Sequence, residues 1–596
     1  MGSFIKTTLA AALGLLIAIG LLMMFGAVLL AGLVSATSRE QSGTAANSVL
    51  VIDQASFTEL TGNAQQSYTD GSLFEKPDPG LADALRAIEA AADDDDIKGI
   101  FLDVSALSTG SATAMALHRG LLAFRESGKF VVAHGKYFGQ NQYLVASAAD
   151  QVYLNPAGGL DLRGYGVVAP YFAEGLDRLG VDVNVFYAGD FKSAGEPFFR
   201  STMSDSNRLQ TREYLADLWA IYLDQVAMAR GLERAELERI TEQFLARNDS
   251  SALAYGLVDE LWYKDQLINE LKVRVGIDEE DDLITQSLKS YAATLSTPRG
   301  NVDPFVAVVY AEGMIVDGSP GRGLIGDGDY ARLVRKLRRD EDCKAIVLRV
   351  NSGGGSAMAS ENIWRELKLA GEEGIPIITS MGDVAASGGY YIAMPSDTIY
   401  AEPNTITGSI GVVGIVPNFG RMLEDQAGIH FDTVRTGEYA ASFSAVVPWS
   451  EQEKQFVQEG IEEVYELFTS RVAEGRGLPL STVKRYAKGR VYSGQDALDL
   501  GLVDRLGSLD DAIANAARLT EYELEELRIA SYPRLRDPQE ELIEELLGNG
   551  SDKRSVSLRD QTMSAVLGQH YEPLRPWLNL LDQSGPQAVM LERVVE

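Results

Sequence analysis

Cysteine and histidine are scarce in this chain, and the few that occur are scattered. Cys343 is the only cysteine among 596 residues, so an intrachain disulfide framework is excluded. The four histidines, His118, His134, His430 and His570, show no spacing typical of metal ligands. A hydrolase built on this sequence must therefore find its general base in another residue type. The sequence implies no metal, nucleotide or organic cofactor.

Basic residues are also few, because 53 lysines and arginines stand against 85 aspartates and glutamates, for a formal charge of −32. Phosphate binding needs a basic face, so the composition argues against a nucleic-acid partner. The excess of acid is typical of a surface adapted for solubility, for instance in a saline habitat. An acidic functional patch is the alternative that the composition leaves open.

Charged residues are missing altogether between residues 7 and 38. The apolar part of this segment is longer than the roughly 20 residues that cross a bilayer as a helix. A cleaved secretory signal is the alternative, but its apolar region is usually only about 7–15 residues long. We therefore expect residues 1–40 to form an uncleaved transmembrane helix. Lys6 on the short flank places that flank in the cytoplasm and most of the chain outside it.

An internal repeat is the most informative feature of the sequence. YLVASAADQVYLNP at Tyr143–Pro156 returns as YYIAMPSDTIYAEP at Tyr390–Pro403, with Tyr, Asp, Tyr and Pro each recurring 247 residues later. GLVD at Gly256–Asp259 returns at Gly501–Asp504, at a nearly equal distance. Several matches in the same order indicate a duplication of one domain.

Each copy alternates strand and helix patterns. Residues 306–316 and 345–350 are apolar, β-branched runs of the kind buried in a parallel sheet, and residues 330–340 between them have helical spacing. One amphipathic helix is present in both copies, with apolar positions Leu215, Leu218, Trp219, Tyr222 and Val226 in the first and Val457, Ile461, Val464, Tyr465 and Phe468 in the second. This alternation predicts two α/β layered domains. The expected boundaries are an anchor at 1–40, a first repeat at 48–285, a linker at 286–303, a second repeat at 304–540 and a tail at 541–596.

Two glycine-rich segments of the second copy follow apolar strands, RVNSGGGSA at 349–357 and SMGDVAASGGYY at 380–391. Glycines directly after a strand let backbone N–H groups approach a ligand, as in an anion cradle or an oxyanion hole. Ser387 lies between two alanines and two glycines, so we expect an exposed hydroxyl there, with the N–H of Gly388 directed at an oxyanion. A purely structural turn is the alternative, since most such turns have no catalytic role.

Four segments together resemble the signal peptide peptidase A (protease IV) family in its long, duplicated bacterial form. They are AASGGY at 385–390, TGSIG at 407–411, NSGGGSAMASE at 351–361 and AGDFKSAGEPF at 188–198. The resemblance covers roughly residues 48–530 and the N-terminal anchor. It implies two Clp-protease/crotonase-like α/β domains in tandem, preceded by a transmembrane helix.

The resemblance also implies roles for individual residues. Ser387 would be the nucleophile and Lys192 the general base of a Ser/Lys dyad. The hydroxyl of Ser409 would hold the lysine amine, and the backbone N–H groups of Gly354 and Gly388 would form the oxyanion hole.

The family implies substrates and a location as well. Hydrophobic peptides left in the membrane after secretion, such as cleaved signal peptides, would be hydrolysed. The protein would be a homotetramer in the bacterial cytoplasmic (inner) membrane, crossing it once, with its catalytic part facing outside the cytoplasm.

The repeat supports this assignment independently, because the two copies have lost complementary residues. Extending the 247-residue offset places Ser387 opposite Gln140. Aligning GDFKS with GEYAA places Lys192 opposite Ala440. One dyad per chain would therefore be assembled across the two copies.

A serine hydroxyl needs an adjacent base, and a lysine can act as one if its pKa falls from about 10.4 towards neutrality. Burial between two domains lowers the pKa of an amine because it disfavours the ammonium. The apolar residues that we expect around Lys192 are Phe191, Ala194, Pro197, Phe198 and Phe199. A surface lysine in a loop is the alternative.

Two other functions remain to be compared with a peptidase. A crotonase-like acyl-CoA enzyme would explain the glycine loops, since it also binds an oxyanion, but not Ser387 or the anchor. An inactive membrane scaffold would explain the fold, but it has no need to retain both Ser387 and Lys192.

Overall fold

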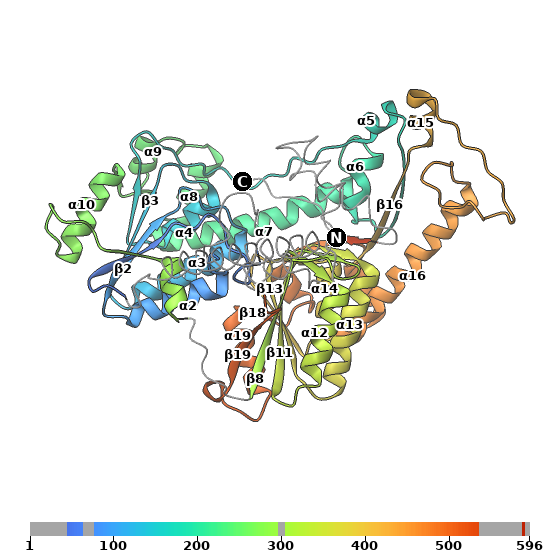
Figure 1. The fold of residues 1–596 in the computed structure, drawn as a ribbon. Coiled ribbons are helices and arrows are strands. Elements are labelled where there is room, and N and C mark those ends of the chain that lie inside the picture. Colours follow the sequence, from blue (N-terminus) through green and yellow to red (C-terminus); the bar gives the residue numbers. More distant parts are fainter. Residues whose placement is uncertain (1–43, 64–76, 296–303, 536–586, 590–596) are drawn as a thin grey trace, which may run out of the picture.

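The computed structural model describes residues 44–63, 77–295, 304–535 and 587–589 (Figure 1). The predicted anchor at 1–40 lies outside the described residues, and so does the predicted tail at 541–596 except for one short strand. Among the residues that are described, no helix is long and apolar enough to span a bilayer.

Two parallel sheets with the same strand order form the centres of the two copies (Figure 1). The first has the order β6 (Glu260–Leu261), β4 (Gln151–Leu154), β3 (Phe130–Gly135), β2 (Ile97–Asp103), β1 (Ser48–Ile52) and β7 (Thr285–Ser287). The second has the order β18 (Arg505–Leu506), β14 (Thr398–Ala401), β13 (Ile377–Ala386), β11 (Cys343–Ser352), β8 (Phe305–Glu312) and β19 (Arg528–Tyr532). It is extended by β15 (Ile406–Gly408), parallel to the end of β13, and by β17 (Val491–Ser493), antiparallel to β15.

Helices cover both faces of each sheet. In the first copy α2 (Leu81–Asp93), α3 (Ser111–Arg125), α4 (Gln140–Ser147) and α7 (Asp205–Arg230) share one core, and α10 (Lys264–Val275) packs on the other face. In the second, α12 (Asp327–Arg338), α13 (Ala357–Glu372), α14 (Gly388–Ala393) and α16 (Glu451–Arg476) oppose α19 (Leu509–Arg518). The central strands are buried on both faces, which explains their continuous apolar runs. Apart from α11, treated below, the other α-helices of the described residues are α5 (Ala173–Arg178), α6 (Glu196–Phe199), α8 (Arg234–Glu242), α9 (Asp249–Ala254), α15 (Gly420–Ala427), α17 (Leu480–Tyr486) and α18 (Gly494–Asp499).

Matching details confirm the predicted duplication. The hydroxyl of Tyr143 donates to Leu257 O at 2.6 Å, and the hydroxyl of Tyr390 donates to Leu502 O at 2.7 Å. Helices α7 and α16 both have 26 residues, and each ends at a glycine in the left-handed conformation. The α/β class and the two-copy architecture expected from the sequence are therefore present.

The region predicted as a linker, residues 286–303, differs from the expectation in its first part. β7 pairs in parallel with β1, and α11 (Leu288–Leu295) buries Leu288, Tyr291 and Ala292 in the first core. In the strand order β7 occupies the place that β19 has in the second copy. The serine and threonine content of this segment conceals three apolar positions at helical spacing.

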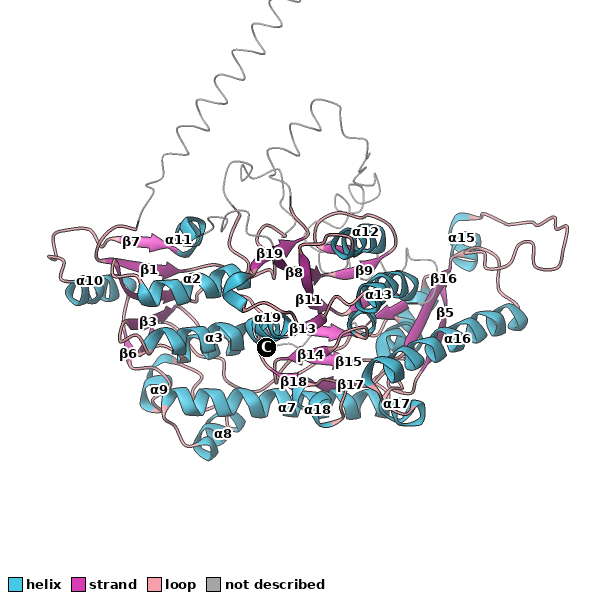
Figure 2. Ribbon diagram, turned by 90° about the horizontal axis from the view of Figure 1, so that it is seen from below, coloured by secondary structure: helices cyan, strands magenta, loops and turns pink. Residues whose placement is uncertain are grey.

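A third sheet joins the two copies. Its order is β10 (Leu324–Gly326), β9 (Met314–Val316), β12 (Gly354–Ser356), β20 (Gln587–Val589), β16 (Val412–Asn418) and β5 (Asp182–Ala188). β5 belongs to the first copy by sequence, yet it pairs antiparallel with all of β16 from the second. Helix α7 then runs beneath both copies, in contact with α4 and with β17 (Figure 2). This crossing carries residues 189–199 of the first copy into the second.

Candidate active site

Ser387 stands between the end of β13 and the start of α14. Most of the predicted glycine-rich segment at 380–391 is strand rather than loop, because β13 continues to Ala386. Ser387 has φ of 57°, a conformation that is costly for a residue with a side chain and is often found at functional sites. The backbone N–H of Ser387 donates to Gly408 O at 2.9 Å, which fixes this turn. The side chain is fully buried, in contrast to the exposed hydroxyl that the sequence suggested.

Lys192 reaches Ser387 from the first copy. It follows β5, just before a short 3₁₀ turn at Ser193–Gly195. Its Nζ lies 2.8 Å from the Oγ of Ser387, 3.0 Å from the Oγ of Ser409 and 3.1 Å from the carbonyl oxygen of Ser409. A neutral amine has two N–H groups and one lone pair. The two oxygens of Ser409 can accept both N–H groups, which leaves the lone pair for the hydroxyl of Ser387.

Burial controls the charge of this lysine. Its side chain is 4% exposed, and desolvation lowers the pKa of the Lys192 amine to about 7. No carboxylate among the described residues forms an ion pair with it. Of the apolar neighbours expected from the sequence, Ala194, Pro197 and Phe198 are buried, whereas Phe199 is 41% exposed.

Ser409 follows β15 and also has a positive φ, 51°. Its N–H donates to Arg490 O at 2.7 Å, so β15 and the residues before β17 hold it in place. Both of its oxygens face Lys192 as a result.

Gly354 and Gly388 lie beside each other, and Gly388 directly follows Ser387. A Cβ on Gly388 would lie 2.7 Å from the Oγ of Ser360 and 3.2 Å from the Cα of Gly354, so only glycine fits there. Gly388 opens α14, where backbone N–H groups have no partner within the helix. The N–H of Gly354 instead donates to the Oγ of Ser352 at 3.1 Å. Ser352 lies within the segments quoted at 349–357 and 351–361, but sequence reasoning gave it no role.

The equivalent positions of the other copy carry no dyad. Gln140 opens α4 and is buried, and its Oε1 accepts from the N–H groups of Arg163 and Gly164 at 3.1 and 2.7 Å. At the position equivalent to Ser387, the first copy therefore has an amide that makes hydrogen bonds to the backbone. Ala440 lies in an exposed segment after β16.

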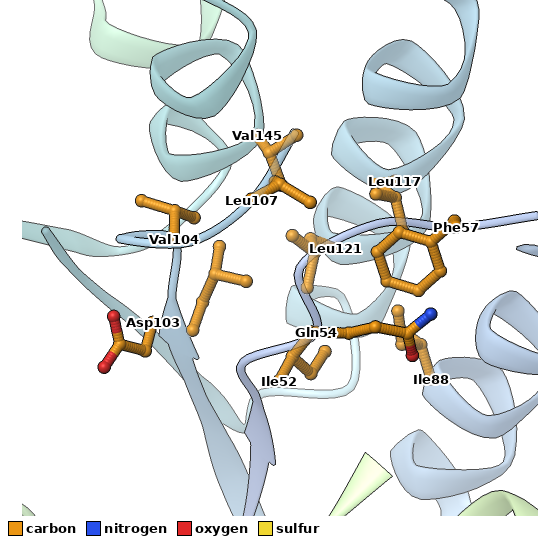
Figure 3. Close-up of a pocket in the computed structure, with 11 residues that line it drawn as sticks. Ile52, Gln54, Phe57, Ile88, Asp103, Val104, Leu107, Leu117, Leu121 and Val145 are labelled. Carbon is orange, nitrogen blue, oxygen red and sulfur yellow. The ribbon is translucent and has the colours of Figure 1, made fainter. Parts of the chain in front are cut away.

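A small pocket in the first copy has a different character (Figure 3). Its polar lining comes from Gln54 and Asp103, and the other side chains are apolar: Ile52, Phe57, Ile88, Val104, Leu107, Leu117, Leu121 and Leu102 with Val145. Its lining contains no serine, cysteine or lysine.

Comparison with known proteins agrees with the duplicated architecture. Two segments, residues 123–278 and 370–523, match peptidase family S49, one in each copy. Protease 4 of Haemophilus influenzae is 36% identical over 73% of this chain and 72% of its own length. Protease 4 of Salmonella typhi is 35% identical over 79% of this chain and 77% of its own length. The chloroplastic serine protease SPPA of Arabidopsis thaliana is 32% identical over 80% and 71%. With the family matched in both copies, and relatives aligned over most of their length, this chain belongs to peptidase family S49 and is a serine peptidase.

Proposed function

We propose that the chain is a membrane-anchored serine endopeptidase that uses a Ser387–Lys192 dyad to degrade hydrophobic peptides, such as cleaved signal peptides. The observation that carries this proposal is the 2.8 Å approach of the Lys192 amine to the Ser387 hydroxyl in a buried site. A nucleophile and a base within hydrogen-bond reach, with the base oriented by a third group, form the arrangement that activates a serine.

The reaction follows from these positions. Neutral Lys192 accepts the proton of Ser387 as Oγ attacks the scissile carbonyl carbon, and the N–H of Gly388 stabilises the oxyanion. The C–N bond then breaks, and the ammonium of Lys192 protonates the leaving amine. A water molecule next gives its proton to Lys192 and attacks the acyl-enzyme, which releases the acid and restores the hydroxyl of Ser387.

The third sheet supports a peptide as the substrate. β20 lies between β12 and β16 and is antiparallel to both, with Val589 opposite Gly354 and Gln587 opposite Val413. An extended segment therefore fits as an added strand directly beside Gly354, which lies against Gly388. Strand addition of this kind is a common mode of peptide recognition. An acyl-CoA substrate has no backbone with which to make such a ladder.

The anchor and the assembly belong to the same proposal. Residues 1–40 would hold the site at the outer surface of the bacterial cytoplasmic membrane, where hydrophobic peptides remain after secretion. A homotetramer would restrict access by folded proteins. Support for the anchor comes from the uncharged apolar sequence between residues 7 and 38.

A serine-reactive acylating probe tests the activity. The parent protein should become labelled at Ser387 and cleave a short hydrophobic peptide, while Ser387→Ala should do neither and should keep the parental Tm. Lys192→Met should lose nearly as much activity. Undiminished turnover in Ser387→Ala would place the nucleophile elsewhere, and turnover of an acyl-CoA thioester without labelling would favour a crotonase-like enzyme.

A further inference from the structure

Gln210 is a buried amide, 1% exposed, that touches the segment carrying the lysine. It lies in the second turn of α7, and its Nε2 donates to Phe191 O at 2.9 Å and to the Oγ of Ser193 at 3.3 Å. These two residues directly precede and follow Lys192. Asn207, one turn earlier in α7, offers Nε2 a third acceptor at 3.3 Å.

The other end of the same amide holds the second copy. The Oε1 of Gln210 accepts from the N–H of Val491 at 3.2 Å. Val491 opens β17, which pairs with β15 so that Val491 lies opposite Gly408, the residue before Ser409. One side chain therefore connects the lysine segment of the first copy to the strand pair that presents Ser409.

We propose that Gln210 is a positioning residue for Lys192, which sets the approach of its amine to Ser387 and Ser409 across the joint between the two copies. This inference rests on the proposed role of Lys192 as the general base. Gln210 would fix the position of residues 191–193 relative to the strand pair β15–β17. Neither β5 nor β15 alone determines the distance between the Nζ of Lys192 and the Oγ of Ser387.

The fit around Lys192 shows how little displacement the joint tolerates. Gly489 lies against the lysine so closely that a Cβ added there would be 2.6 Å from the Cβ of Lys192. The N–H of Phe191 donates to Lys488 O at 2.8 Å on that side. Gln210 contacts Phe191 and Ser193, so the residues on both sides of Lys192 in the chain are held by hydrogen bonds. A misplacement of about 1 Å in a catalytic group can cost about a hundredfold in rate.

The copy that lacks a counterpart of Lys192 also lacks a counterpart of Gln210. Counted from the first residue of each 26-residue helix, Phe456 of α16 stands where Gln210 stands in α7. Phe456 is 39% exposed, and its copy has Ala440 in place of the lysine. A residue needed only to build the helix would not be expected to differ in this way.

Several charged groups surround the hydrogen bonds of Gln210. Their ion pairs are relevant to any dependence of activity on pH. Arg490 pairs with Glu213 of α7 and lies over the ring of Phe191. The carboxylate of Glu196 accepts from the N–H of Ser204 and from Asn207. On the outer side, Asp190 pairs with Lys488, and both are largely exposed. All of these groups are present in the variants below, so a comparison with the parent isolates Gln210.

The test is the variant Gln210→Met, which keeps the length of the side chain and removes its polar atoms. We expect kcat to fall about ten- to a hundredfold with KM within about twofold of the parent. The alkaline-rising limb of kcat/KM should move to higher pH, because water that enters a loosened joint restores solvation of the ammonium. Gln210→Glu retains an acceptor for Val491 and should shift the limb at least as far, since it adds a negative charge; it also serves if Gln210→Met does not fold.

Gln140→Met is the matched control, because it removes an equally buried amide at the start of α4 whose hydrogen bonds go to Arg163 and Gly164. It should lower Tm without moving the pH limb. The inference would be overturned if both Gln210 variants had the kcat and the pH dependence of kcat/KM of the parent. It would also be overturned if Gln140→Met shifted that pH dependence as far as the Gln210 variants do. Lys192→Met separates the two levels: if it remains active, the proposed function fails, and if it is inactive while the Gln210 variants are normal, only the inference about Gln210 fails.

Discussion

The amine of Lys192 lies 2.8 Å from the hydroxyl of Ser387, although 195 residues separate them in the chain and each belongs to a different copy of the repeat. The strand β5 makes this possible, because it leaves the first copy and pairs with β16 of the second. Each copy by itself has half of the pair.

Activity should rise with pH through the pKa of Lys192, which burial lowers to about 7. The amine must be neutral to accept the proton of Ser387, so kcat/KM on a short hydrophobic peptide should increase about tenfold per pH unit below 7 and level off above it. Ser409→Ala should move this limb or lower the rate with little change in Tm, because the Ser409 carbonyl still accepts from the amine. A flat profile from pH 6 to 9 in both proteins would contradict a titrating lysine base.

The same lysine should make stability depend on pH. Its pKa is about 7 in the folded protein, against an ordinary value of 10.5, so between these values the unfolded chain binds a proton that the folded protein does not. The free energy of unfolding should therefore rise with pH across this window, by at most about 1.4 kcal/mol per unit.

Urea unfolding of the parent and Lys192→Met at pH 5, 6, 7, 8 and 9 measures this effect, since the difference removes the contributions of all other groups. The free energy of unfolding of the parent should increase relative to that of the variant as pH rises above 7. Well below pH 7 the difference between the two proteins should be constant. A difference that does not change with pH would mean that Lys192 remains charged in the folded protein.

Restoring a serine to the first copy should not create a second site. Gln140→Ser supplies a hydroxyl, but Ala440 offers no base, and the loop at Gly164 loses its hydrogen bonds to the amide. We expect no labelling at position 140 by the acylating probe and a lower Tm. Labelling there in a chain that also carries Ser387→Ala would show that the first copy does not need a lysine.

Removing residues 586–596 should make the space between β12 and β16 more accessible to a peptide. β20 occupies the space between β12 and β16, so a substrate strand must displace it. KM for a short peptide should fall several-fold in the truncated protein while kcat stays near the parental value. Ala588→Pro in the full chain should act in the same direction, because proline cannot donate to the ladder. An unchanged KM in both would mean that peptides bind elsewhere.

Much of the architecture could be predicted from local patterns. The central strands are continuous apolar runs because both of their faces are buried, and this property is visible in residues 306–311 and 345–350. The predicted run at 306–316 is two strands, because the strand breaks at Gly313 and the chain continues as β9 in the third sheet. The repeat identified equivalent positions, so it showed that Gln140 stands opposite Ser387 without any structural information. The strand β7 and the helix α11 were missed because their apolar residues are few and lie among serines and threonines.

The sequence by itself determined the two-copy α/β fold and the residues Ser387, Lys192, Ser409, Gly354 and Gly388 as candidates, since these depend on motifs and on one offset. Only the tertiary structure decided that the first three meet within hydrogen-bond distance, that the N–H of Gly354 is engaged by Ser352, and that Gln210 bridges the joint. The physical reason is that hydrogen bonds between distant segments depend on how strands from two copies pair. Nothing in the local sequence of β5 specifies that β16 will be its partner.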